Sequence, residues 1–386
     1  MKHFQVKNFG PLEAVDLQFG DLTIVVGAQA SGKSLCLELL KLIVDRNHII
    51  NTLDRYNYIW GHNTEKILDV FFGEGMNGIW TDETRATLDE TPFLRTHIPK
   101  KAEDKDETLF YIPAQRILSI SDGRPKNFME FDNSSPYILR SFSETLRLFM
   151  QNGMGKGDTV FPLKNRLKGF LRHSFNQSIF HDGKIVMVEM AGQKKLRMNI
   201  DRLNIPFMSW SAGQKEFMPL LLAFYCLSGP PSKVVKRDKY KYVVLEEPEM
   251  GLHPQAIVSI ILQIIELMQS GYKIILSTHS PVLLEFAWAY NILQAEQNAD
   301  RYKALHRIFG IREDTSVSNM MNGLLEHKSI RTYYFCRQPN GKVVSQDIST
   351  LDVENIDENI AEWGGISEFS SKVSDIISQY IAFSHE

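Results

Sequence analysis

The feature that most constrains this chain is a glycine-rich turn between an apolar strand pattern and an apolar helix pattern. Residues 22–26 read LTIVV, residues 27–34 read GAQASGKS and residues 35–44 read LCLELLKLIV. The turn matches G-x-x-x-x-G-K-[ST] at every fixed position. Gly27 and Gly32 permit close backbone approach, so successive N–H groups can point at one phosphate. The segment therefore predicts nucleotide binding in an α/β fold.

The side chains of this turn add specific contacts to that prediction. Lys33 is expected to reach the β- and γ-phosphates, and the Ser34 hydroxyl is expected to bind Mg²⁺. The helix that begins at Leu35 adds its positive N-terminal end. The expected ligands are thus ATP and Mg²⁺. The other loop residues expected to surround the phosphates are Ala28, Gln29, Ala30 and Ser31.

Two carboxylates follow a second apolar strand, in VVLEEPEMGLHP (243–254). Adjacent buried acids are costly unless a cation or proton offsets them, and Mg²⁺ beside a triphosphate is the expected partner. Glu246 would hold the ion directly or through water, and Glu247 would orient and deprotonate the attacking water.

A third apolar strand, in IILSTHSP (274–281), ends near His279. Ligands of parallel sheets bind at the carboxyl ends of the strands, where this strand would end beside the other two. We therefore expect His279 to contact the γ-phosphate.

Strand patterns alternate with helix patterns along most of the chain, which indicates a single α/β domain, residues 1–386, with a mainly parallel sheet. Residues 49–106 lack a clear period and are interpreted as an insertion in the core. Residues 125–208 form a predicted helical lid and hairpin segment, with helices at 135–150 and 163–174 and a β-hairpin at 183–200.

Residues 325–386 are predicted to form a hairpin that turns at Asn340-Gly341, followed by an amphipathic helix. Its apolar residues, spaced every three or four positions, leave two interpretations open. The favoured one is packing on the protein's own core, and the other is docking to another chain. These residues are Ile366, Phe369, Val373, Ile376, Ile377, Tyr380 and Ile381.

Composition excludes several classes of protein. Cys36, Cys226 and Cys336 lie far apart without CxxC spacing, which argues against a disulfide framework or a zinc site. No apolar run approaches the ~18 residues of a membrane span, and the N-terminus lacks a signal pattern, so we expect a cytoplasmic protein without membrane contact. The net charge of −3 favours no particular partner. Lys/Arg-rich stretches at 164–173 and 231–241 keep nucleic acid open as a partner, although solvated loops and helix faces explain them more simply.

Together these motifs make the chain resemble an ABC-type ATPase of the SMC/RecF/OLD-like branch. GAQASGKS is similar to its Walker A, VVLEEPEMGLHP to its Walker B and D-loop, and STHSP to its histidine switch. FQVKNFGPLEAVDLQF resembles its opening hairpin, YIPAQR (111–116) its Q-loop and SAGQKE (211–216) its signature motif. The resemblance implies a P-loop NTPase with an ABC-ATPase-like head, in which a mainly parallel sheet carries an N-terminal antiparallel β subdomain and helical insertions. It also places Gln115 near Mg²⁺ and the attacking water.

The sequence departs from the family pattern at three places. Glu246 stands where the Walker B metal acid is usually Asp, so its contact with Mg²⁺ is indirect or altered in geometry. Ala212 stands in the signature where transporters have Gly, and His253 stands where they have the D-loop Asp. No aromatic residue is clearly indicated as the adenine platform, and Phe9 is the one candidate.

In such ATPases the signature loop of one protomer caps the γ-phosphate held by Walker A of the other. The resemblance therefore implies a homodimer or higher homo-oligomer, in which ATP hydrolysis switches the state of the assembly. The residues that would cap the phosphate in trans are Ser211, Ala212, Gly213 and Gln214.

Residues 285–386 contain no Asp-x-Asp of a TOPRIM nuclease, and the sequence has no HNH-type cluster and no sustained heptads. The favoured hypothesis is an ATPase switch or sensor that controls a separately encoded effector, such as a nuclease or toxin in antiviral defence. The alternative is a RecF-like DNA repair or recombination ATPase that binds DNA directly. A transporter ATPase is disfavoured by the EPEMGLHP form and the large insertions.

Overall fold

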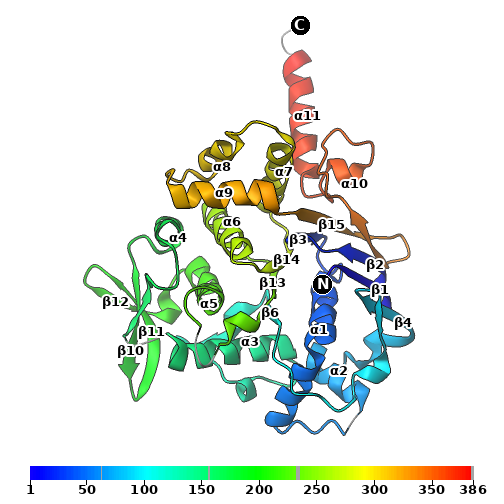
Figure 1. Ribbon diagram of the computed structural model, residues 1–386, viewed down its shortest axis with the longest axis vertical. Helices are drawn as coiled ribbons and strands as arrows, with labels where there is room; N and C mark the ends of the chain where they lie inside the picture. The colour runs from blue at the N-terminus through cyan, green and yellow to red at the C-terminus, as the bar shows by residue number, and fades with distance from the viewer. Residues whose placement is uncertain (62, 155–156, 232–234, 384–386) are drawn as a thin grey trace.

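A large sheet forms the centre of the protein (Figure 1). The computed structural model describes residues 1–61, 63–154, 157–231 and 235–383. Among these residues the strand order is β5-β4-β1-β2-β16-β15-β3-β14-β13-β6. The strands are β1 (His3–Phe9), β2 (Leu12–Gln18), β3 (Leu22–Gly27), β4 (Trp80–Leu88), β5 (Thr91–Phe93), β6 (Leu109–Ile112), β13 (Tyr242–Glu246), β14 (Lys273–Ser277), β15 (Ile330–Arg337) and β16 (Val343–Asp347).

The parallel part of the sheet positions the predicted site. β3 pairs in parallel with β14 and β15, and β13 pairs in parallel with β14 and β6. The predicted α/β class with a mainly parallel sheet is confirmed. The carboxyl ends of these strands consequently meet at one edge, as the sequence predicted. The antiparallel N-terminal strands continue the same sheet, because β1 pairs with β2 and β4 while β2 pairs with β16.

The sheet separates two hydrophobic cores, because successive strand residues point to opposite faces. Val25 and Val244 belong to one core, whereas Ile24 and Leu245 belong to the other. The first core is covered by α1 (Lys33–Arg55) and α2 (Thr64–Phe72), and the second by α5 (Ala212–Leu227), α6 (Pro254–Gln269), α7 (Pro281–Ala295) and α9 (Thr315–His327). Thus α1 and α5, which follow the two predicted phosphate loops, lie on opposite faces of the sheet.

A smaller antiparallel sheet lies beside α5 and has the strand order β12-β11-β10-β9 (Figure 1). The predicted hairpin at 183–200 is confirmed within it. The strands are β9 (Thr159–Phe161), β10 (Lys184–Met190), β11 (Gln193–Ile200) and β12 (Leu203–Pro206). A further two-stranded sheet joins β7 (Ile120–Ser121) to β8 (Arg124–Pro125).

Of the two helices predicted within residues 125–208, one agrees with the structure and the other differs at its start. α3 (Tyr137–Leu148) continues into a π-helical turn, η5 (Phe149–Gly153), which agrees with the helix predicted at 135–150. The helix predicted at 163–174 is wrong at its start, because α4 begins only at Gly169 (Gly169–Phe175). The buried Arg166 side chain donates to carbonyls that follow α5, and this contact fixes the preceding segment in an irregular path.

The remaining elements connect these layers or extend from them. Residues 49–55 continue α1, and β4 and β5 of the 49–106 segment extend the sheet beyond β1. The other helices are α8 (Arg301–Phe309), α10 (Glu358–Ala361) and α11 (Glu368–Phe383). The short helical turns are η1 (Asn77–Ile79), η2 (Arg95–His97), η3 (Arg116–Ser119), η4 (Phe128–Glu130), η6 (Asn176–Phe180), η7 (Phe207–Ser209) and η8 (Arg237–Lys239). Among the described helices, none has both the length and the apolar character needed to cross a bilayer.

The C-terminal helix α11 projects from the body of the protein (Figure 1). Ile366 precedes it and packs against the core, but Phe369 is 79% exposed and Ile377 is 53% exposed. Val373 and Ile376 are exposed as well. The favoured prediction that this apolar face packs on the protein's own core is therefore wrong for these four side chains, since no other element covers them in the described part of the chain. The side chains of Tyr380 and Ile381 lie outside the described residues.

The exposure of α11 predicts an asymmetry between two truncations. Ile376→Ser should change the free energy of unfolding by less than about 0.5 kcal/mol, as expected for an exposed side chain. Leu324→Ala, in the buried face of α9, should lower it by about 2–5 kcal/mol. Denaturant unfolding of both variants measures the difference. A loss of stability in Ile376→Ser comparable to that in Leu324→Ala would show that α11 packs on the protein in solution.

Candidate functional site

The turn between β3 and α1 requires glycine at two of its fixed motif positions. Gly27 has φ +153° and Gly32 has φ +80°. A Cβ on Gly27 would lie 2.9 Å from the Phe335 carbonyl oxygen, and one on Gly32 would lie 2.8 Å from a Leu12 methyl carbon. Both glycines therefore have a positive φ, and at both of them a Cβ would lie too close to a neighbouring atom. Between them, Ala28, Gln29 and Ala30 are exposed, so their backbone is open to a ligand.

Lys33 folds back over this turn. Its Nζ donates to the carbonyl oxygens of Gly27, at 2.8 Å, and Ala28, at 2.9 Å. The side chain is buried, and burial lowers the pKa of its ammonium group despite the nearby Glu246 and Glu247 carboxylates. The ammonium group is thus held where a phosphate in the turn would meet it. Ser31 is buried beside it, and Ser34 is exposed in the first turn of α1.

Glu246 ends β13 with a buried and incompletely paired carboxylate. Its Oε2 accepts from the Ala114 N–H at 3.2 Å, whereas Oε1 has no hydrogen-bond partner within the described residues. Burial raises the pKa of this carboxyl above its ordinary value, and the nearby Ser34 hydroxyl offsets part of that effect. A buried carboxylate oxygen without a partner needs an explanation, and a hard cation beside the phosphate turn supplies one. The oxygen-bearing side chains of Ser34, Gln115 and Glu246 fit Mg²⁺ chemically.

Glu247 leaves the strand in a left-handed conformation, with φ +40°. Its N–H donates to the Ser277 carbonyl oxygen at 2.8 Å, which fastens it to β14. Its Oε1 lies 3.3 Å from Nε2 of His279, and this contact lowers the pKa of the Glu247 carboxyl. The predicted acid and the predicted histidine are therefore brought together.

Glu249 orders the loop that carries His279, a role that was not predicted from the sequence. Its Oε1 accepts from the Thr278 hydroxyl and from the His279 N–H, both at 2.7 Å. The pattern that could have indicated it is EEPE, in which Glu249 is the third acid and follows Glu246 by three residues. Arg116, next to the exposed Gln115, was also missed, and it is fully buried.

The second small-residue turn caps α5. The Ser211 Oγ accepts from the Gln214 N–H at 3.3 Å, and the Gln214 side chain accepts from the Ser211 N–H at 3.1 Å. This reciprocal capping box fixes the helix N-terminus. Ser211 and Ala212 are exposed, whereas a Cβ on Gly213 would lie 2.9 Å from the Gly251 carbonyl oxygen. The turn thus presents a helix N-terminus to solvent while contacting the loop after β13.

The predicted residues form two groups. The first group lies at or after the ends of parallel strands at one edge of the sheet and comprises Lys33, Gln115, Glu246, Glu247 and His279. The turn from Ser211 to Gln214 belongs instead to α5, on the face opposite α1.

The candidate adenine platform does not hold. Phe9 is fully buried, with ring centroids 5.7 Å from both Phe72 and Trp80, so it cannot stack on a base. The sequence around Phe9 does not indicate this packing, because its aromatic partners lie far away in the chain.

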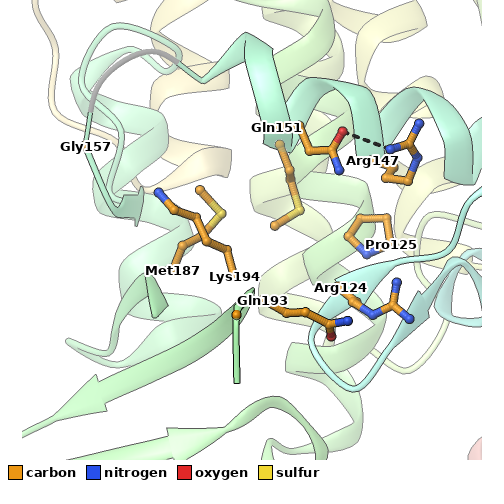
Figure 2. Close-up of a pocket in the computed structure, with 10 residues that line it drawn as sticks. Arg124, Pro125, Arg147, Gln151, Gly157, Met187, Gln193 and Lys194 are labelled. Carbon is orange, nitrogen blue, oxygen red and sulfur yellow. Dashed lines mark hydrogen bonds between the residues drawn. The ribbon is translucent and has the colours of Figure 1, made fainter. Parts of the chain in front are cut away.

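A cavity of about 660 Å³ lies between β8, the end of α3 and the β10–β11 hairpin (Figure 2). Its cationic lining residues are Arg124, Arg147 and Lys194, and each forms an ion pair with an acid, namely Glu130, Glu144 and Asp158 respectively. None of the predicted site residues lines this cavity. It is therefore separate from the candidate nucleotide site.

Comparisons with known proteins give one family match and several distant likenesses. The family described as "AAA domain, putative AbiEii toxin, Type IV TA system" matches residues 22–285. The Old nuclease of Escherichia phage P2 is 27% identical over 116 residues, which are 30% of this chain and 19% of that protein. The matched region thus spans about a fifth of the length of that relative.

Two solved structures show a distant likeness. The SMC head domain from Thermotoga maritima has 12% identity and a TM-score of 0.40, covering 90% of this chain and 98% of that chain. A dimeric bacterial ABC transporter cassette has 11% identity and a TM-score of 0.35, covering 73% of this chain and 90% of that chain.

The geometry of the phosphate turn predicts the effect of removing its cation. Lys33→Ala should weaken ATP binding at least tenfold, about 1.4 kcal/mol, because it removes the ammonium group held over the turn. Titration calorimetry with ATP and Mg²⁺ measures this directly. Lys7→Ala, which removes an exposed lysine of β1, is the control and should leave affinity unchanged. Equal affinity in Lys33→Ala and wild type would contradict the assignment.

Proposed function

Because the chain belongs to this AAA-domain family and is a P-loop ATPase domain of the SMC/OLD-like ABC type, we propose that it hydrolyses ATP in sites built from two copies of the chain. One observation carries the proposal. The two turns suited to phosphate, 27–34 and 211–214, begin helices on opposite faces of one sheet. They are therefore poorly placed to enclose a single phosphate within one chain, while two copies related by a twofold axis can pair them.

Within one copy, the turn from Gly27 to Ser34 holds the phosphates through its backbone N–H groups and Lys33. Ser34, Gln115 and Glu246 would hold Mg²⁺, which would neutralise the charge of the phosphate oxygens. Glu246 is one methylene longer than the usual aspartate, and its unpaired Oε1 gives it an oxygen to offer.

Glu247 orients the attacking water and accepts its proton. Its depressed pKa keeps the carboxyl ionised near neutral pH, and its contact with His279 fixes the side chain. His279 in turn lies at the edge where the γ-phosphate would sit. Hydrolysis therefore depends on two adjacent strands, β13 and β14, which position the acid and the histidine 3.3 Å apart.

The second copy contributes Ser211, Ala212, Gly213 and Gln214. The exposed N-terminus of its α5 carries positive dipole charge, which suits a γ-phosphate. The Ser211 hydroxyl adds a hydrogen-bond donor there. Loss of the γ-phosphate on hydrolysis would remove the group that joins the two copies, so ATP turnover acts as a switch on assembly.

We also propose that this switch controls a separately encoded effector in antiviral defence. The family description names a toxin and a toxin–antitoxin system, and the phage relative is a nuclease. A nuclease or a toxin is therefore the class of partner that these relationships support. This part of the proposal rests on similarity rather than on the geometry of the site.

Direct DNA binding is the second candidate function, and one observation favours it. Residues of both basic stretches, including Lys164 and Arg237, line one surface depression. Several of the cations are already engaged, however. Arg166 is buried, Lys168 pairs with Glu266 at 2.8 Å, and Lys236 and Lys239 both pair with Asp106 at 3.3 Å. Residues 232–234 of the second stretch lie outside the described residues.

A mixing experiment tests the composite site. Ser211→Arg should abolish hydrolysis by blocking the signature turn while ATP binding persists, and Lys33→Ala should abolish hydrolysis by removing the phosphate cation. Mixed in equal amounts, the two variants should regain about a quarter of wild-type activity, because half of the dimers are mixed and each contains one intact site. Steady-state phosphate release measures this.

The matched control is Ser316→Arg, which alters an exposed serine in the first turn of α9 and should leave hydrolysis unchanged. A mixture with no activity above the sum of its components would contradict the assignment of one site to two chains.

A further inference from the structure

Arg116 is a fully buried arginine that lies between the end of β13 and the start of α5. It follows Gln115 and contacts both the end of β13 and the first turns of α5. A buried guanidinium group is costly unless its donors are satisfied, and arginine cannot lose its charge to avoid that cost. A buried arginine at this position therefore indicates a specific structural role.

The donors of Arg116 all reach backbone carbonyl oxygens. Nη1 donates to Glu246 at 3.1 Å and to Glu247 at 3.2 Å, and Nη2 donates to Glu247 at 3.2 Å and to Pro248 at 3.3 Å. Nε donates to the Glu216 carbonyl of α5 at 3.3 Å. The guanidinium group therefore fixes the path of three consecutive residues after β13 and ties that path to α5.

The path that it fixes is strained at the proposed base. A left-handed conformation in a residue other than glycine costs about 1–2 kcal/mol and persists only where the surroundings enforce it. Glu247 has this conformation, and its carbonyl oxygen accepts from two nitrogens of Arg116. The same turn directs the Glu247 carboxylate toward His279.

The same loop supports the signature turn. A Cβ on Gly251 would lie 3.1 Å from Cγ of Glu216, and one on Gly213 would lie 2.9 Å from the Gly251 carbonyl oxygen. The first turns of α5 are thus seated closely on the loop after β13. A shift of residues 246–248 would therefore displace the N-terminus of α5, through Arg116 and through the close approach of Gly213 to Gly251.

We propose that Arg116 is a positioning residue that holds Glu247 for hydrolysis at one ATP and couples it to the signature turn that serves the other ATP. The inference rests on the proposed function, since the second ATP is bound by the partner copy. Lysine cannot replace this residue, because its single nitrogen lacks the planar fork that reaches carbonyls of two elements.

The chain offers a matched control for a purely structural role. Arg166 is also buried, and its donors reach the carbonyl oxygens of Tyr225, Ser228, Pro230 and Gly153. It contacts the far end of α5 and touches none of the proposed site residues. Arg116→Lys and Arg166→Lys should both lower the melting temperature.

Only Arg116→Lys should lower kcat, by about 100-fold, with the affinity for ATP changed less than threefold. Equal kcat in Arg116→Lys, Arg166→Lys and wild type would overturn the positioning role. Absence of hydrolysis in the wild type would instead refute the proposed function, so the two failures are distinguishable.

Mixed dimers separate positioning from coupling. In the Ser211→Arg and Lys33→Ala mixture, the first chain supplies the phosphate turn and Glu247, and the second supplies only the signature turn. Arg116→Lys added to the first chain should lower the regained activity about 100-fold. Added to the second chain, it should lower the activity about tenfold, within the usual range of coupling between sites. An unchanged rate in the second mixture would overturn the coupling role.

Discussion

The parallel pairing of β6, β13, β14 and β3 is the constraint on which the candidate site depends. Its register places Glu246 beside Ser277 and Leu276 beside Ile24, so the residues after each strand emerge together. A slip of one residue in β13 would turn the Glu246 side chain to the other face of the sheet. The phosphate turn, the two acids, His279 and Arg116 all follow from this one alignment.

The same alternation of strand residues underlies the proposal that each ATP site is built from two copies of the chain. It gives the sheet two buried faces, and α1 and α5 pack against different ones. The loop after β13 lies between them, because it carries the two acids and also supports the first turns of α5. In the proposed dimer, the signature turn that completes the partner's site would stay connected to the acids of its own chain through Arg116 and Gly251.

The sequence was most informative where function is coded by residue type at the end of a strand. Gly27, Lys33, Glu246 and His279 could be placed at one edge of the sheet, because each lies at or shortly after the end of a buried strand. The contacts of Arg116 could not be predicted, since its acceptors in α5, in β13 and after β13 lie 100 to 132 residues away in the chain and nothing local shows that it is buried. Likewise the spacing of apolar residues in α11 is the same for a packed and for an exposed helix, and only the fold decides between them.

The central claim is that ATP joins two copies of this chain, and light scattering of the Glu247→Gln variant tests it most directly. Glutamine keeps the shape of the side chain but cannot accept the proton, so bound ATP should persist. We predict that Mg²⁺ and ATP double the measured mass of this variant, and that the double variant with Lys33→Ala shows no change. A variant that binds ATP and keeps the mass of its nucleotide-free sample would contradict the account.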